Sequence, residues 1–231
     1  MKFAHWIPAL ALALAAALPA QAQHLHEGDI EVAVTAGRLV VLGGHGVHAD
    51  GARIFEGDLG DLAGGPYSTD DPGFDSEDAS FAAGTLVNYR AIGSLLAWNG
   101  SAWTAAPAAL SLRLTGNLGE ETLWQAAGVS GDVTGLIGQA GSTGKIHEHL
   151  DFTLTGSGRV AVAAYLVQLQ LEAGSLQDST PFYMAFNRGM DEAGFEAAVH
   201  SLSAVPEPQA ALMLALGLAG LGLLRLRRGA R

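Results

Sequence analysis

The feature that most constrains this chain is a succession of short segments in which apolar and polar residues alternate, separated by glycine-containing turns. Residues 29–34 (DIEVAV) alternate in this way, residues 35–38 (TAGR) supply a turn, and another apolar segment follows. Residues 29–43 are therefore predicted to form a β-hairpin. A second hairpin is expected over residues 94–106, with Asn99 and Gly100 between two arms that each carry a tryptophan.

Further segments have the composition of strands. They are residues 110–116, 145–156, 159–173 and 181–187. A single helix is predicted over residues 191–202, because its first turn is acidic and its apolar residues fall on one face. The glycine- and acid-rich stretch 57–80 is expected to be a long loop. Together these features predict a mostly β domain, an antiparallel β-sandwich or jelly roll with one short C-terminal helix.

The two ends of the chain differ in character from the middle. Residues 1–22 have one lysine, Lys2, near their start, continue with an apolar run and end in Ala20-Gln21-Ala22, which is the order of a secretory signal peptide cut by signal peptidase after Ala22. An N-terminal membrane anchor is the alternative, but the apolar run is short for one. Residues 23–204 are then the exported domain, long enough to bury a core.

The C-terminal segment 205–231 has three parts. Two prolines, Pro206 and Pro208, flank Glu207 and stop any preceding helix. About sixteen apolar or small residues follow, which as a helix would span roughly 24 Å and leave the next arginines on the cytoplasmic side. This part is predicted to be a C-terminal transmembrane helix, short for a bilayer whose hydrocarbon core is about 30 Å thick.

The order of these parts resembles the PEP-CTERM sorting signal of Gram-negative bacteria. The matching residues are Pro206, Glu207, Pro208, Arg225, Arg227 and Arg228. The resemblance covers residues 205–231 and implies that exosortase, a membrane protease-transpeptidase, processes the tail. The protein would then be held transiently in the membrane before it reaches the cell surface or an exopolysaccharide matrix. An ordinary tail anchor is the alternative.

Charge and cysteine content exclude several functions. The chain has 12 basic and 23 acidic residues, a net charge of −11. Residues 23–204 contain 7 of the basic and 22 of the acidic residues, a net charge of −15. A domain with this negative charge repels the phosphate backbone of nucleic acids, and we therefore do not expect it to bind them. The chain has no cysteine, which excludes disulfides, zinc-thiolate sites and cysteine nucleophiles.

Histidines occur in closely spaced pairs. His147 and His149 lie two residues apart in the predicted strand 145–156, so they should share one face with Asp151. His24 and His26 have the same spacing near the expected new N-terminus. Imidazole and carboxylate ligands suit zinc or another divalent transition metal, and two such pairs on neighbouring strands would form one site. The alternative is that these histidines are solvated surface residues.

A weaker resemblance points in the same direction. The segment "HLHEGDIEV", with His24, His26 and Asp29, an extended β domain and a PEP-CTERM tail is similar to exported PEP-CTERM proteins repressed by the zinc-uptake regulator. The resemblance implies a role in zinc supply rather than in catalysis.

Two other groups of residues offer the chemistry of binding sites. Residues 67–78 hold five carboxylates with the oxygen ligands that calcium prefers, although the EF-hand order is absent and the stretch can equally be a solvated acidic loop. They are Asp70, Asp71, Asp75, Glu77 and Asp78. Trp98 and Trp103 can form a sugar-stacking platform, although cross-strand packing is the alternative.

The sequence has no G-x-S-x-G, Walker, H-E-x-x-H or dinucleotide-binding pattern. We therefore expect a non-enzymatic exported protein of the cell surface or exopolysaccharide matrix that binds a divalent metal through its H-x-H pairs. The alternatives are a metal-dependent extracellular enzyme and a carbohydrate-binding matrix module.

Overall fold

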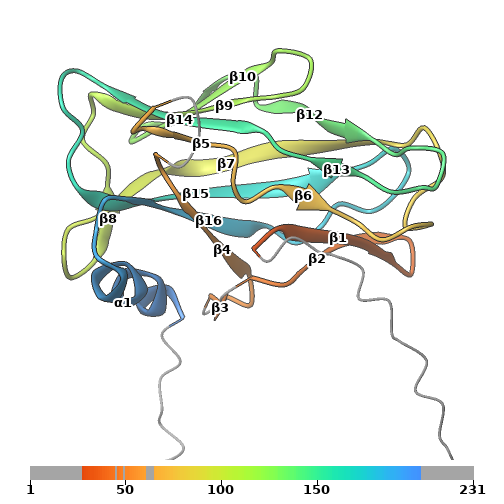
Figure 1. The fold of residues 1–231 in the computed structure, drawn as a ribbon, viewed down its shortest axis with the longest axis horizontal. Coiled ribbons are helices and arrows are strands. Elements are labelled where there is room, and N and C mark those ends of the chain that lie inside the picture. The colour runs from red at the N-terminus through yellow and green to blue at the C-terminus, as the bar shows by residue number, and fades with distance from the viewer. Residues whose placement is uncertain (1–27, 45, 49, 61–64, 204–231) are drawn as a thin grey trace, which may run out of the picture.

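The computed structural model describes residues 28–203, except positions 45, 49 and 61–64. Within these residues the chain forms three β-sheets and one helix (Figure 1). The predicted signal peptide 1–22 and the predicted sorting segment 205–231 lie outside the described residues.

The largest sheet runs through the middle of the molecule (Figure 1). In spatial order its strands are β12 (Thr134–Gln139), β7 (Leu86–Trp98), β15 (Ala163–Glu172), β16 (Phe182–Arg188), β4 (Arg53–Asp58) and β3 (Gly46–Val47), with β8 (Trp103–Ala105) paired to β7. All of its pairs are antiparallel except β16 with β4, which run parallel. The two strands of that parallel pair come from opposite ends of the domain.

A second sheet of five strands covers one face of the large sheet (Figure 1). Its strands, in spatial order, are β11 (Gly128–Gly131), β10 (Glu121–Gln125), β9 (Leu110–Thr115), β14 (Asp151–Gly156) and β5 (Ser68–Thr69). Leu110, Leu112 and Leu114 of β9 are buried, whereas the residues between them are half-buried. This period of two is why the segment forms a strand with one face toward the core.

The third sheet has four strands and carries the candidate site. Its strands, in spatial order, are β13 (His147–Glu148), β6 (Phe74–Asp75), β1 (Ile30–Thr35) and β2 (Arg38–Leu42). β1 and β2 form the hairpin predicted over 29–43, and its turn residues Ala36 and Gly37 both have positive φ. β6 lies parallel to β1, while β13 pairs with β6 in the antiparallel sense.

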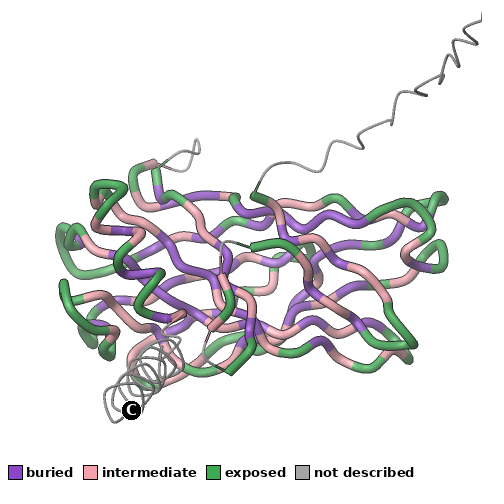
Figure 2. Tube along the Cα trace, turned by 90° about the horizontal axis from the view of Figure 1, so that it is seen from below, coloured by how far each residue is buried: buried purple, intermediate pink, exposed green. Residues whose placement is uncertain are grey.

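Buried side chains from all three sheets form one continuous core, visible in Figure 2 as buried positions that recur along each strand. The rings of Phe152 in β14 and Phe186 in β16 pack 4.8 Å apart, so the five- and seven-stranded sheets meet directly. The Trp124 indole, which is buried in this core, donates to the Ile92 carbonyl at 3.0 Å. A domain without disulfides depends on packing of this kind.

Helix α1 (Glu192–Leu202) covers the other face of the large sheet (Figure 1). Asp191 is its N-cap and accepts a hydrogen bond from the Gly194 amide at 2.8 Å. Its buried side chains, which include Phe195 and Ala198, pack on Ala164 and Ala185 of the sheet. The helix predicted over residues 191–202 is thus confirmed.

The expected fold class as a whole is wrong. The mostly β content and the single short helix are found, but two of the three sheets are mixed rather than antiparallel, because β1 pairs with β6 and β4 with β16 in parallel. In the part of the chain that the structure describes, no helix combines the length and apolarity needed to cross a membrane. The expected fold class is therefore corrected to a mostly β fold with one short helix, and the transmembrane helix expected within residues 205–231 lies outside the described residues.

Candidate metal centre

His147 and His149 lie at the end of the short strand β13, but the segment around them is not the single strand that the sequence predicts. Strand β13 ends at Glu148, and β14 begins at Asp151 in a different sheet, where Asp151 pairs with Thr115 of β9. The two histidines are brought together, with ring centroids 5.3 Å apart. Asp151 belongs to neither of the two groups of potential metal ligands among the described residues.

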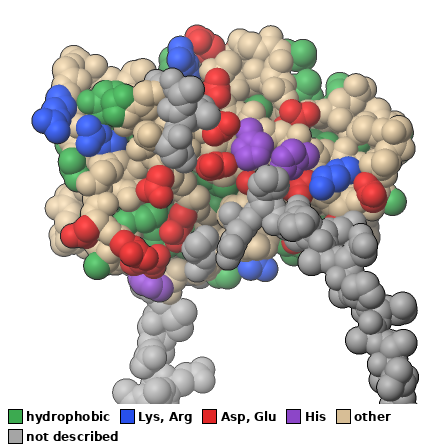
Figure 3. Space-filling model, viewed as in Figure 1, with side chains coloured by type: hydrophobic (Ala, Val, Ile, Leu, Met, Phe, Trp, Pro, Cys, Tyr) green, Lys and Arg blue, Asp and Glu red, His purple; other side chains and the backbone are tan. Residues whose placement is uncertain are grey.

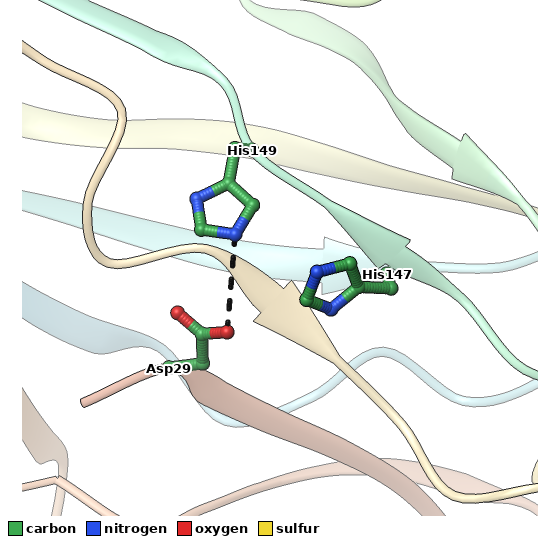
Figure 4. A group of neighbouring side chains, drawn as sticks. All are labelled: Asp29, His147 and His149. Carbon is green, nitrogen blue, oxygen red and sulfur yellow. Dashed lines mark ion pairs between the residues drawn. The ribbon is translucent and has the colours of Figure 1, made fainter. Parts of the chain in front are cut away.

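The orientation of the His149 ring is fixed from one side. Its Nδ1 atom lies 3.0 Å from the Asp70 carbonyl oxygen and 3.3 Å from Asp71 Oδ1. A proton on Nδ1 can be donated to the carbonyl, and this leaves the lone pair of the neutral ring on Nε2. Nε2 faces Asp29 Oδ2 at 4.0 Å (Figure 4). A histidine held in this way presents the nitrogen that a metal ion binds.

Asp29 supplies a carboxylate oxygen with an unused lone pair. Its Oδ1 accepts a hydrogen bond from the Gly73 amide at 2.9 Å, which points Oδ2 toward His149. The side chain is only 4% exposed, and Oδ2 is buried with no hydrogen-bond partner among the described residues. A buried carboxylate oxygen without a partner is costly, and a bound cation is one way to satisfy it.

Gly73 provides the space in which Asp29 and His149 approach each other. A Cβ atom at Gly73 would lie 2.6 Å from His149 Cε1 and 2.7 Å from Nε2. Any side chain there would therefore occupy the position of the imidazole ring. The backbone of Gly73 also holds Asp29 in place, because its carbonyl accepts from the Ile30 amide at 2.9 Å.

His147 completes the group from the solvent side. Its side chain is 40% exposed, compared with 28% for His149, and its Nδ1 lies 3.5 Å from Asp75 Oδ1. Asp75 is itself 1% exposed and is held by Lys145 Nζ at 3.0 Å and by the Ser76 amide at 2.9 Å. Figure 3 shows histidine side chains gathered on this face among acidic ones.

The dimensions of the group suit a small cation. Asp29, His147 and His149 each offer one ligand atom, and these three atoms lie within 4.8 Å of one another. Zinc binds nitrogen and carboxylate oxygen at about 2.0–2.2 Å, and tetrahedral angles then place two ligand atoms about 3.4 Å apart. An approach of about 0.6 Å between Asp29 Oδ2 and His149 Nε2 would give that spacing. Two imidazoles and one carboxylate are ligands typical of zinc and of other divalent transition metals.

The predicted ligands are therefore only partly brought together. His24 and His26 lie outside the described residues. Asp29 was not predicted as a ligand, and its role depends on the pairing of β1 with β6, which joins residues more than forty positions apart. Its one sequence signal is its place, just before a predicted strand and three residues after His26.

The five carboxylates considered for calcium do not converge on one point. Asp70 and Asp71 lie beside His149 and form a second group of potential ligands with it. Asp75 is buried and paired with Lys145, whereas Glu77 and Asp78 are exposed. The stretch 57–80, predicted as a loop, contributes the two short strands β5 and β6.

The two tryptophans pack against the helix side of the large sheet. Their rings are 5.6 Å apart, and Trp103 donates its indole N–H to the Ala198 carbonyl of α1 at 3.0 Å. Trp98 borders a surface groove of about 550 Å³. The neighbouring Asn99 side chain accepts from the amides of the turn that follows it, so it is already used within the hairpin.

No protein-family model matches this chain, and the search of curated proteins found no match either. The geometry of the centre itself is thus the basis for proposing a function.

Proposed function

We propose that this chain binds one divalent transition metal ion, zinc in the first place, through Asp29, His147 and His149. The observation that carries the proposal is the buried Asp29 Oδ2, which has no hydrogen-bond partner among the described residues and faces His149 Nε2 at 4.0 Å. The Asp70 carbonyl supports it, because it fixes the ring with Nε2 toward that oxygen.

The proposed setting is outside the cell. Residues 1–22 have the order of a signal peptide, and residues 205–231 carry the motif that resembles the PEP-CTERM signal. We propose a non-enzymatic protein that exosortase processes and that resides at the cell surface or in an exopolysaccharide matrix. Expression with and without exosortase, followed by mass measurement of the mature chain, tests this part. A chain that keeps Arg225, Arg227 and Arg228 in both cases would contradict it.

Metal binding is tested by elemental analysis of the purified chain after incubation with zinc and dialysis. We expect about one zinc per chain, and a content close to zero when His147 and His149 are both replaced by alanine. The matched control is Asp151→Asn, which changes a carboxylate two residues from His149 that pairs in the other sheet. Equal zinc contents in the wild type and the double variant would refute the proposal.

A second readout is thermal stability. Asp29 lies 118 positions before His147, so only the folded state can offer all three ligands together. A ligand that binds only the folded state stabilises it by about 2.7 kcal/mol when its concentration is 100 times Kd. Zinc should therefore raise the melting temperature of the wild type, and the rise should be lost in the double variant.

A further inference from the structure

We propose that the bound ion fastens strand β1 to strand β13 across the short strand β6, so that metal binding closes the four-stranded sheet. This inference rests on the proposed function, since it concerns the same centre. It adds a mechanical consequence: the ion is a clip between strands that are not themselves neighbours in the sheet.

The first observation is the small size of the strand between them. β6 has only two residues, Phe74 and Asp75, and each pairs once with β1 and once with β13. Two-residue pairings of this kind contribute few hydrogen bonds. The link between β1 and β13 therefore depends on a short bridge, and sheets with few ladder bonds open locally at low cost.

The second observation is that two of the proposed ligands lie on either side of β6 and approach each other. Asp29 immediately precedes β1, and His149 immediately follows β13. They meet over Gly73, the residue before β6, whose missing side chain leaves their path open. An ion held by both would give β1 and β13 the direct connection that the hydrogen-bond ladder lacks.

The third observation separates the clip from simple metal capture. His147 and His149 are close in sequence and can bind an ion even when β1 has moved away. Asp29 can join them only when the Ile30 amide is bonded to the Gly73 carbonyl and the Gly73 amide to Asp29 Oδ1, both at 2.9 Å. An ion that uses all three ligands therefore favours the closed form, and at saturation it lowers the population of the open form by the ratio of its affinities for the closed and open forms.

Amide hydrogen exchange of the full chain, measured with and without zinc, tests this. We expect zinc to slow exchange of the Ile30 and Gly73 amides at least ten-fold. The Leu154 amide, bonded to the Tyr67 carbonyl at 2.8 Å in the five-stranded sheet, should change little.

Asp29→Asn is the informative variant. The asparagine keeps an oxygen that can accept from the Gly73 amide but loses the charged oxygen that faces His149. We expect it to retain weaker zinc binding by the histidines while losing the zinc-dependent slowing at Ile30. Asp151→Asn is the control that should preserve both.

The outcomes distinguish the two proposals. A wild-type chain that takes up no zinc refutes the proposed function and the clip together. A chain that binds zinc while its Ile30 and Gly73 amides exchange at unchanged rates refutes the clip alone. The clip is also refuted if Asp29→Asn shows the full zinc-dependent slowing, because the histidines would then suffice. The comparison of wild type with and without zinc requires no variant to fold.

Discussion

Replacing Gly73 by alanine tests the geometry of the centre with the addition of a single methyl group. The new Cβ would lie 2.6 to 2.9 Å from three atoms of the His149 ring, whereas ordinary contact begins at 3.4 Å. The ring must therefore move by about 0.8 Å, several times the roughly 0.2 Å tolerance of a metal–ligand bond. We expect His149 then to lose its place in the proposed metal site.

The expected magnitudes differ for affinity and for stability. Removing a residue that hydrogen-bonds to a metal ligand lowers metal affinity about 10- to 100-fold. Loss of the ligand itself should lower the affinity by at least about 100-fold, which corresponds to about 2.7 kcal/mol. The metal-free fold should change little. Gly73 does not have a positive φ, and Gly→Ala at a compatible position contributes about 0.4–1 kcal/mol. The loss of the His149 to Asp70 hydrogen bond offsets this by about 1 kcal/mol.

The assay is isothermal titration with zinc, combined with a melting curve of the metal-free chain. Gly141→Ala is the matched control, because a Cβ there would have only an ordinary contact, 3.8 Å from the Lys145 carbonyl oxygen. We expect Gly73→Ala to weaken zinc binding about 100-fold while the metal-free melting temperature moves by no more than a few degrees. Wild-type zinc affinity in Gly73→Ala would show that His149 is not a ligand.

Three further predictions concern the scaffold. Burial alone would raise the pKa of Glu120, but its own amide and those of Leu118 and Leu136 donate to the carboxylate and lower the pKa overall. The ionised Glu120 therefore stabilises the fold fully above the usual glutamate pKa, and this contribution is lost as the pH falls through the lowered pKa. Glu120→Gln should flatten the acid limb of a plot of unfolding free energy against pH. An unchanged acid limb would contradict this. Asp191→Ala removes the N-cap of α1 and should lower the free energy of unfolding by about 1 kcal/mol in urea titration, with no loss of zinc binding. Phe152→Ala leaves a cavity between two sheets and should cost about 3–5 kcal/mol by the same measurement; a loss below 1 kcal/mol would contradict the packing described.

Local patterns in the sequence predict the local elements well. The alternation in residues 29–43 is sufficient to predict a hairpin, and the acidic start of residues 191–202 helps to predict a helix. Both elements form between residues that are neighbours in the sequence, so local patterns identify them. The parallel pairs are a different case. β4 and β16 meet because of the whole chain path, and nothing within residues 53–58 indicates its partner.

The error over residues 145–156 has a specific cause. Ile146, Leu150, Phe152 and Leu154 are buried and Glu148, in the same phase, is half-buried, so the period of two continues through the segment. The hydrogen-bond partner nevertheless changes from β6 to β9 between Glu148 and Asp151. Side-chain alternation reports which way residues face and carries no information about which strand lies alongside. For this reason the spacing of His147 and His149 is informative in the sequence, whereas the third proposed ligand, Asp29, is identified only by the tertiary structure.

The parallel pairing of β4 with β16 also sets the order in which the molecule can be completed. Ile54 and Tyr183 are register partners but stand 129 positions apart, so β4 is synthesised long before the strand beside which it will lie. Until β16 emerges, β4 has an open edge toward the middle of the large sheet, and open edges are the sites at which chains pair wrongly with one another. Long-range pairing of this kind slows folding, because a large loop must close before the contact forms. The last strand of the domain to be made is the one that inserts between β15 and β4 and closes the sheet.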